Sequence, residues 1–336
     1  MAHIPASVET SEDMEYLLSE RVKLLSQGKI REIYQHPKEE DSLLMVTSDR
    51  MSAFDFVMPR KVPQKGEVLT ALTHFWLTDI LREFPSHFKR SSLNHWLNAV
   101  HDLKADLPEL PLERSLVIRK TEIPPFEMIF RHHLGGSVYK KYLDTRLVAG
   151  LAVQKGYKKW EKLPHPHFTP STKASKGHDE NKNVSEYIDA MGEQGIRAIQ
   201  MFRSAYEKAY AYAESRGILI LDTKFEGLTM IADEVITPDS SRFTTVESYN
   251  NAMQNGGDPI FLDKEFFRQW GKTVETPFGM GLGSLKNPED PEQLAFVNSL
   301  EIPDRVIKET STRYINIGEI LTGCNLADYQ ARFMCV

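Results

Sequence analysis

The sequence lacks the features that mark several large classes of protein. Its 336 residues include only two cysteines, Cys324 and Cys335, and neither belongs to a C-x-x-C or Cys/His cluster. A disulfide framework and a structural zinc site are therefore not expected. No apolar run approaches the ~18 residues of a membrane-spanning helix, and the N-terminal segment lacks the apolar core of a signal peptide. We expect a cytoplasmic protein with no membrane contact.

The chain also has no excess of positive charge. It carries 41 Lys and Arg against 47 Asp and Glu, a net charge of −6. General nucleic-acid binders usually carry a basic excess, so we expect no nucleic-acid partner. A few focused cations can still hold a small anion in an acidic protein. Neither a Walker GxxxxGK[ST] loop nor the HRD and DFG motifs of protein kinases occur.

The hydrophobic pattern predicts a mixture of strands and helices, and the length suggests two lobes. Patterns typical of strands, the first two forming a hairpin, occur over 28–35, 43–48, 115–123 and 126–134. Apolar residues repeat every three or four positions, as in amphipathic helices, over 67–84, 199–213 and 303–321. Two further segments, predicted as a long loop and a surface connection, are 154–183 and 276–294.

The segment 218–242 contains the most informative polar pattern. We predict two strands here, joined by a short turn at Gly227. Residues two apart share one face of a strand, so Asp222, Lys224 and Glu226 point the same way directly after an apolar run. Asp233 and Glu234 end the second predicted strand, which would bring four carboxylates together. Magnesium binds carboxylate and phosphate oxygens, so this hairpin is either a magnesium site or an exposed hairpin with ion pairs.

Two patterns indicate anion binding. In Gly28-Lys29-Ile30-Arg31, the glycine permits close approach of a phosphate and the two cations share a strand face. The alternative is an ordinary exposed basic strand. Arg131 ends one predicted strand and Ser137 opens a predicted helix after two glycines, an arrangement that can bind phosphate through backbone N–H groups. The alternative here is a plain serine N-cap.

A third polar pattern lies at residues 48–55, Ser-Asp-Arg-Met-Ser-Ala-Phe-Asp, after a buried strand. Small, polar and charged residues in this position suit a binding loop that includes Asp55. A capped turn fits the composition equally well.

These segments together resemble one enzyme family, the SAICAR synthetases of purine biosynthesis. The matching segments, which run in family order from about residue 22 to 323, are QGKIREIY, TSDRMSAFDFVMP, PQKGEVLTALTHFWL, FEMIFRHHLGGSVYKKY, FTPSTKASKGHDENKN, ILILDTKFEG, ADEVITPDSSRF and a terminal helix ending in ILTG. The pair DTKFE and DEVITPDSSR is highly specific. In the family the Glu of this motif is usually followed by Phe-Gly and several turn residues, whereas here Glu226 meets Gly227 directly.

The resemblance implies a fold and a reaction. The fold is α+β, with an antiparallel-sheet N-terminal lobe (residues 22–118) packed on a larger α+β lobe (residues 119–336) and an ATP-grasp or kinase-like cleft between them. The reaction joins L-aspartate to the carboxylate of CAIR, the carboxylated aminoimidazole ribonucleotide, and converts ATP to ADP and phosphate with Mg²⁺. The protein is expected to be a monomer or a homodimer.

The resemblance also implies roles for individual residues. Catalytic roles fall on Asp222, Lys224 and Arg242. ATP binding falls on Gly28, Lys29, Arg31, Glu226 and Asp233, of which Glu226 and Asp233 would hold the magnesium. Binding of CAIR or aspartate falls on Asp55, Arg131, Ser137, Asp239, Ser241 and Arg242. A kinase-like phosphotransferase and a non-catalytic nucleotide-binding protein are the alternative functions.

Overall fold

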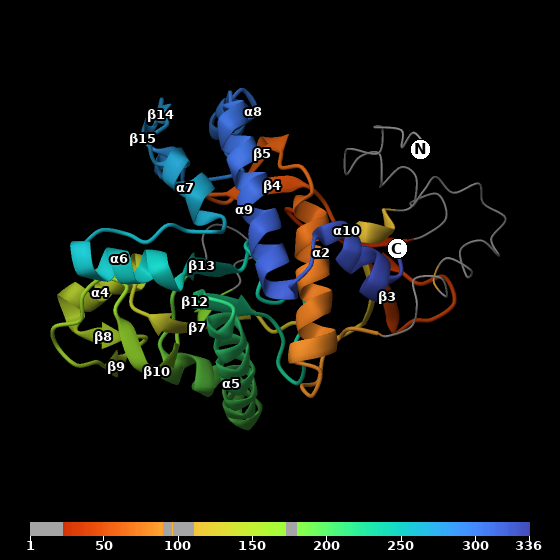
Figure 1. Ribbon diagram of the computed structural model, residues 1–336, viewed down its shortest axis with the longest axis horizontal. Helices are drawn as coiled ribbons and strands as arrows, with labels where there is room; N and C mark the ends of the chain where they lie inside the picture. The colour runs from red at the N-terminus through yellow and green to blue at the C-terminus, as the bar shows by residue number, and fades with distance from the viewer. Residues whose placement is uncertain (1–22, 90–95, 97–110, 173–179) are drawn as a thin grey trace.

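The computed structural model describes residues 23–89, 96, 111–172 and 180–336 (Figure 1). The N-terminal part is built on a four-stranded antiparallel sheet with the strand order β1-β2-β3-β6. Its strands are β1 (Leu24–Gln27), β2 (Arg31–Gln35), β3 (Ser42–Thr47) and β6 (Ser115–Arg119). Because β2 and β3 pair antiparallel, the predicted hairpin is confirmed, although its first strand begins at Arg31 and leaves Lys29 in the preceding turn.

The second sheet forms the centre of the molecule. Its strands, in the order β10-β7-β12-β13 with β11 also on β7, are β7 (Phe126–His133), β10 (Lys162–Phe168), β11 (Ser171–Thr172), β12 (Ile218–Phe225) and β13 (Ser241–Thr245). Helix α5 (Val184–Ser215) covers one face, where Tyr206 stacks on Phe130 and Phe202 packs against Phe225. Charged side chains are thereby confined to the other face.

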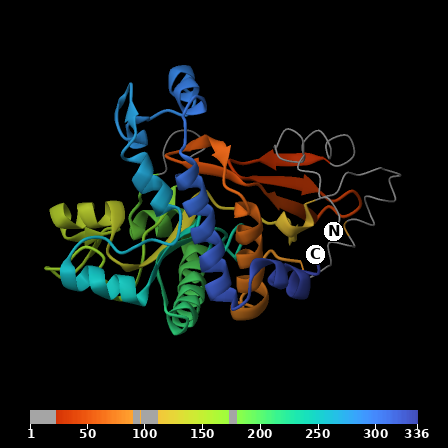
Figure 2. The same cartoon turned by 45° about the horizontal axis from the view of Figure 1, so that its top comes forward.

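Two long helices connect the parts of the molecule. Helix α2 (Lys65–Phe75) continues into the π-helical segment η1 (Trp76–Ile80), which confirms the helix predicted from Glu67 onward. Helix α9 (Asp304–Thr322) lies beside α2 (Figure 2) and ends at Gly323 in a left-handed conformation, as predicted. The division of the chain into two lobes at residue 118 stays a prediction. Helix α2 belongs to the N-terminal side of this boundary, yet it packs on α9 from the C-terminal side.

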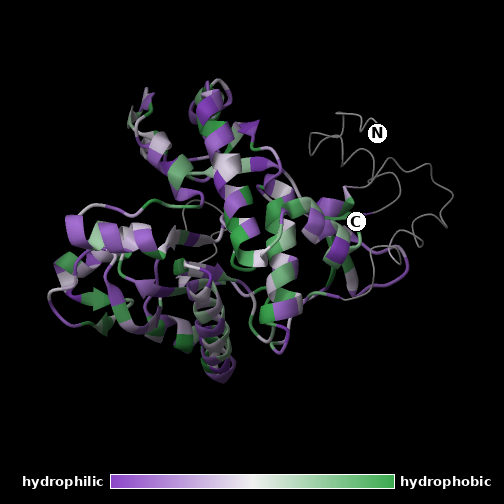
Figure 3. Ribbon diagram, in the orientation of Figure 1, coloured by the Kyte–Doolittle hydropathy of each residue, from purple (hydrophilic) through white to green (hydrophobic). Residues whose placement is uncertain are grey.

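The remaining elements surround these layers. They are β4 (Arg50–Ala53), β5 (Phe56–Lys61), η2 (Leu112–Arg114), α4 (Gly136–Thr145), β8 (Leu147–Val148), β9 (Leu151–Ala152), α6 (Val246–Asn255), α7 (Glu265–Gly271), β14 (Glu275–Thr276), β15 (Gly279–Met280), η3 (Leu282–Ser284), α8 (Pro291–Asn298), α10 (Leu326–Tyr329) and η4 (Gln330–Met334). Figure 3 shows that hydrophobic residues are frequent on α2 and α9 where these helices meet, whereas α6 is mostly hydrophilic. No helix in the described ranges is long and apolar enough to span a bilayer.

Three predictions about local structure are wrong. The second strand of the 218–235 hairpin does not form, because β7 and β13 already occupy both edges of β12. Ile231 instead bridges to Ser86, and Ala232 makes one bridge to Glu226. The predicted loop 154–183 contains β10 and β11, although its residues 173–179 lie outside the described ranges. The predicted surface connection 276–294 buries Leu282 and Leu285 against a cluster that includes Phe267.

Candidate active site

The first cluster of charged residues crosses three strands of the central sheet. Asp222 on β12 lies opposite Arg131 on β7 and Arg242 on β13. Its carboxylate accepts hydrogen bonds from Nη1 of Arg131 at 2.5 Å and from Nε of Arg242 at 3.0 Å. We call these three residues the arginine cluster. Two guanidiniums share one carboxylate, so the cluster has an excess of one positive charge on the polar face of the sheet.

The electrostatics of the arginine cluster favour the ionised form of Asp222. Burial on its own raises the pKa of Asp222, but the guanidiniums of Arg242 and Arg131 outweigh this effect and leave that pKa below its usual value. Arg131 is also fixed by a 2.9 Å hydrogen bond from Nε to the hydroxyl of Thr169. The guanidinium of Arg242 stacks over Trp160, with its Cζ 5.2 Å from the ring centroid. Both arginines are therefore held in defined orientations.

The start of α4 lies against the arginine cluster. Gly136 has a φ of +61°, and a Cβ placed there would stand 2.7 Å from Nη1 of Arg242, so only glycine permits this approach. The N-cap of α4 is Gly135, and Ser137 lies inside the first turn with an exposed side chain. The alternative that Ser137 is a plain N-cap is therefore wrong. Backbone N–H groups at a helix start attract anions, and here they adjoin an arginine.

A second cluster lies around the C-terminal end of β12 and is rich in carboxylates. Nζ of Lys224 lies 2.9 Å from Glu127 on β7 and 3.0 Å from the buried Glu226. Next to it, Arg31 at the start of β2 pairs with Glu234 at 2.8 Å and with Asp233 at 3.4 Å. We call these six residues the acidic cluster. Four carboxylates face two cations, which is an excess of two negative charges when all are ionised.

The short turn after Glu226 brings the two halves of the acidic cluster together. The N–H of Ala232 donates to the carbonyl of Glu226 at 2.9 Å, so Asp233 follows directly beside it. Asp233 has a φ of +56°, a conformation that is unfavourable for most side chains and is often found at functional sites. Burial raises the pKa of Asp233, and the carboxylates of Glu226 and Glu234 raise it further despite Arg31. The surplus of negative charge favours a bound cation.

The structure separates Lys29 from Arg31. Gly28 closes the β1–β2 turn by donating its N–H to the carbonyl of Arg31 at 2.7 Å. Lys29 lies in this turn, is half exposed, and pairs with Asp55 at 3.0 Å. Asp55 belongs to the turn between β4 and β5, where both it and Phe54 have positive φ. The prediction that Lys29 and Arg31 share a strand face is wrong, because the strand begins only at Arg31.

Two predicted substrate-binding residues, Asp239 and Ser241, make internal contacts, and their role toward substrate stays a prediction. Asp239 accepts from Nζ of the fully buried Lys65 at 2.8 Å and from the hydroxyl of Tyr314 at 2.5 Å. These partners, together with Lys264 at 3.7 Å, keep the pKa of Asp239 low although burial on its own would raise it. The hydroxyl of Ser241 bonds to that of Thr223 at 2.7 Å, one position along from the arginine cluster.

Several residues around these clusters were not predicted. Glu127 and Lys264 supply a carboxylate and an ammonium, and burial lowers the pKa of Lys264 to about 8. In a strand over 126–134, alternation places Glu127 and Arg131 on the same face of the sheet. The sequence therefore contained a signal for Glu127. Trp160 carries no such signal, because its contact with Arg242 joins positions 82 residues apart in the sequence.

The acidic cluster offers carboxylate oxygens, which magnesium prefers, but few of them are close enough together to bind one ion. Within the residues that the structure describes, no group of three or more His, Cys, Asp and Glu is arranged as metal ligands. Magnesium commonly uses only one or two protein carboxylates, with substrate phosphates and water completing its shell. The adjacent Glu226 and Asp233, with their surplus negative charge, fit that requirement.

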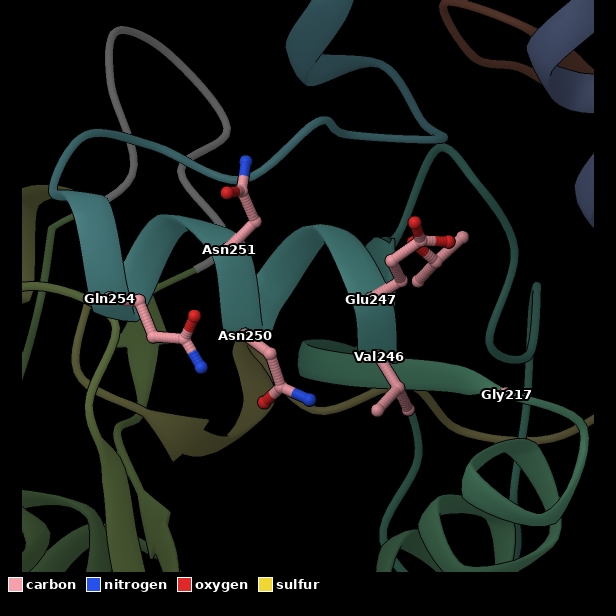
Figure 4. Close-up of a pocket in the computed structure, with 7 residues that line it drawn as sticks. Gly217, Val246, Glu247, Asn250, Asn251 and Gln254 are labelled. Carbon is pink, nitrogen blue, oxygen red and sulfur yellow. The ribbon is translucent and has the colours of Figure 1, made fainter.

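A separate surface depression lies along α6, about 730 Å³ in volume (Figure 4). Its lining residues are Gly217, Thr245, Val246, Glu247, Asn250, Asn251 and Gln254. It adjoins the start of β12 and the end of β13, whereas Asp222 lies near the opposite end of β12. Because this lining contains no cation, the depression does not suit a phosphorylated substrate.

Two clusters of opposite charge, which lie around neighbouring parts of β12, suit an enzyme that binds anions and a cation together. A family model described as SAICAR synthetase matches residues 24–283. The phosphoribosylaminoimidazole-succinocarboxamide synthase of Maridesulfovibrio salexigens is 36% identical, covering 91% of this chain and 95% of the relative. That of Corynebacterium diphtheriae is 35% identical over similar shares, 91% and 95%.

A solved structure shows the same relationship in three dimensions. The SAICAR synthase of Saccharomyces cerevisiae, solved as a complex with SAICAR, superposes with a TM-score of 0.73 and 30% identity, covering 92% of this chain and 97% of that one. The chain belongs to the SAICAR synthetase family. It is an ATP-dependent ligase of purine biosynthesis with a mixed α+β, ATP-grasp-like fold, as the sequence predicts.

Proposed function

We propose that the arginine cluster binds CAIR and L-aspartate while the acidic cluster binds the magnesium and phosphates of ATP. The observation that carries this proposal is the reversal of charge along β12. Asp222 lies between two arginines, whereas Glu226, four residues further, belongs to a group with surplus negative charge. ATP, CAIR and aspartate are all anions, so one group of cations is not enough to neutralise the charge of all three.

The chemistry explains why the two clusters must adjoin. A carboxylate is a poor electrophile, because its charge is delocalised and its leaving group would be oxide. In the proposed reaction a CAIR carboxylate oxygen attacks the γ-phosphorus of ATP, releases ADP and forms an acyl phosphate. The deprotonated amine of aspartate then attacks the acyl carbon, and phosphate leaves as the amide forms. Both steps depend mainly on positioning and charge stabilisation.

Each residue's contribution follows from its contacts. Arg131 and Arg242 are preorganised by Asp222, so they can hold a phosphate or carboxylate without reorienting. Ser137 and the first N–H groups of α4 add donors beside Arg242. Lys29, in its exposed turn, is available to the ATP phosphates. Asp239 supports the site through Lys65 and Tyr314 instead of contacting substrate.

Glu226 and Asp233 are the residues that would hold Mg²⁺. The ion would neutralise charge on the ATP phosphates during phosphoryl transfer. Lys224 and Arg31 form ion pairs with these carboxylates and so hold them in a defined orientation before ATP arrives. A cytoplasmic location and a monomeric or homodimeric state stay predictions.

The test is release of ADP from ATP in the presence of CAIR, measured with and without L-aspartate. Aspartate-dependent release together with formation of SAICAR is the expected result. Release that needs CAIR but ignores aspartate would indicate a phosphotransferase, and no release under any combination would indicate a non-catalytic nucleotide binder.

A further inference from the structure

One small part of this acidic protein is strongly basic. Residues 136–162 contain seven Lys and Arg and only two Asp and Glu, a net charge of +5 in a chain whose total is −6. The segment comprises α4, β8, β9 and the loop that leads to β10. Val138, Tyr142 and Val148 of this segment pack with the flanking Leu134 and Leu163 in one apolar cluster. The positive charge is therefore carried on a compact, structured unit.

Most of these cations are not neutralised by neighbours. Lys159 pairs with Asp258, and Lys162 lies 3.5 Å from Glu214. Four other lysines are exposed, and no carboxylate among the described residues lies in ion-pair distance of them. We call this set the basic strip: Lys140, Lys141, Lys155 and Lys158.

The basic strip lies next to the arginine cluster. Lys140 and Lys141 follow Ser137 by three and four residues in α4, so all three occupy adjacent positions on the helix surface. Lys158 is two residues from Trp160, on which Arg242 stacks. Tyr142 holds the loop of Lys155 to α4 by donating to the carbonyl of Gln154 at 2.8 Å.

We infer that the basic strip is a surface that attracts the anionic nucleotide substrate and guides it to the arginine cluster. This inference rests on the proposed function. A sugar phosphate that also carries a carboxylate has a charge of about −3 at neutral pH. Helix α4, with ten residues, is about 15 Å long, so the strip lies within about two screening lengths of Ser137 at physiological salt. Fields of this kind raise association rates, by ~10- to 10³-fold in known systems.

The test is the association rate of SAICAR, the product that carries the same ribose phosphate, measured by stopped-flow at ionic strengths from low to high. In one variant all four lysines of the strip are changed to Gln: Lys140→Gln, Lys141→Gln, Lys155→Gln and Lys158→Gln. A matched control removes four exposed cations from other parts of the chain: Lys120→Gln, Arg203→Gln, Arg305→Gln and Lys308→Gln. Both variants lose the same total charge.

At low salt the strip variant should bind SAICAR about tenfold more slowly, with dissociation and saturating turnover unchanged. The control should change little, and the difference should vanish at high salt. Equal slowing in both variants, or faster dissociation in the strip variant, would overturn the inference. So would nucleic-acid binding that the strip variant loses while its association with SAICAR stays fast. Absence of aspartate-dependent ADP release in the unmodified chain would instead mean that the proposed function fails.

Discussion

The arginine cluster and the acidic cluster both combine carboxylates with cations and lie around neighbouring parts of β12, yet their charge balance is opposite. In the first, two arginines share Asp222; in the second, four carboxylates share Arg31 and Lys224. Each cluster is left with a charge that its own residues do not neutralise. The comparison teaches that surplus charge, more than residue type, indicates which partner each cluster binds.

The largest expected effect is on folding, at the centre of the arginine cluster. Asp222→Ala leaves two buried guanidiniums without their carboxylate, which should lower the free energy of unfolding by about 3–5 kcal/mol. Denaturant unfolding measures this change. The control is Asp304→Ala, which removes an exposed carboxylate paired with Arg60 and should cost under ~1 kcal/mol. Equal losses would mean that the arginines do not depend on Asp222.

The next effect concerns catalysis in the acidic cluster. Glu226→Ala or Asp233→Ala should lower kcat by about 10²-fold or more, because each removes a proposed magnesium ligand from phosphoryl transfer. Steady-state kinetics at saturating ATP and magnesium measure the loss, and circular dichroism checks the fold. A near-normal kcat in both variants would show that this cluster is not the magnesium site.

A smaller effect is expected when the arginine cluster loses one arginine. Arg131→Ala or Arg242→Ala should weaken the use of CAIR or aspartate by about tenfold to a hundredfold, since a charge-assisted hydrogen bond contributes roughly 1.5–3 kcal/mol. KM is measured for each substrate in turn. The KM for ATP should hardly move; a selective rise in that value would assign these arginines to the triphosphate.

Lys29 should show a smaller and more selective effect. It is half exposed and pairs only with Asp55 in the described structure, so Lys29→Ala should raise the KM for ATP by several-fold and leave stability unchanged. Lys120→Ala, at an exposed position far along the chain, is the matched control. Parallel rises in the KM of all three substrates would argue for a folding defect.

The smallest effect is a difference in titration between the two clusters. The pKa of Asp222 lies below its unfolded value of ~3.9, so its stabilisation is present above that value and is lost as pH falls through the folded pKa. The pKa of Asp233 is raised, so ionisation of Asp233 costs stability as pH rises through the folded pKa. Carboxyl-carbon NMR should show Asp233 titrating at higher pH than Asp222. The reverse order would contradict the charge balance of both clusters.

The sequence predicts the strands and helices well where periodicity is strong, as in β2, β3, β7, α5 and α9. It fails at residues 228–235, because an apolar run reads as a strand whether or not a sheet edge is free to accept it. In this chain β13, which comes later in the sequence, occupies that edge of β12. Whether residues 228–235 form a strand thus depends on pairing between segments that are distant in the sequence. Patterns within a single sequence do not show which segments pair.

The candidate site shows the same division. The face shared by Asp222, Lys224 and Glu226 follows from strand geometry and is visible in the sequence. The internal partners of Asp239 are not, because Lys65 and Tyr314 reach it from helices 174 and 75 residues away. A motif thus indicates which residues gather in one region, but only the fold shows which of them are left available to bind a ligand.

The central claim is that the two clusters bind different ligands, and calorimetry of two variants against two ligands tests it most directly. Arg242→Ala should lose affinity for SAICAR and keep its affinity for magnesium–ADP. Glu226→Ala should show the opposite pattern. Loss of the same ligand in both variants, or of both ligands in each, would contradict the account.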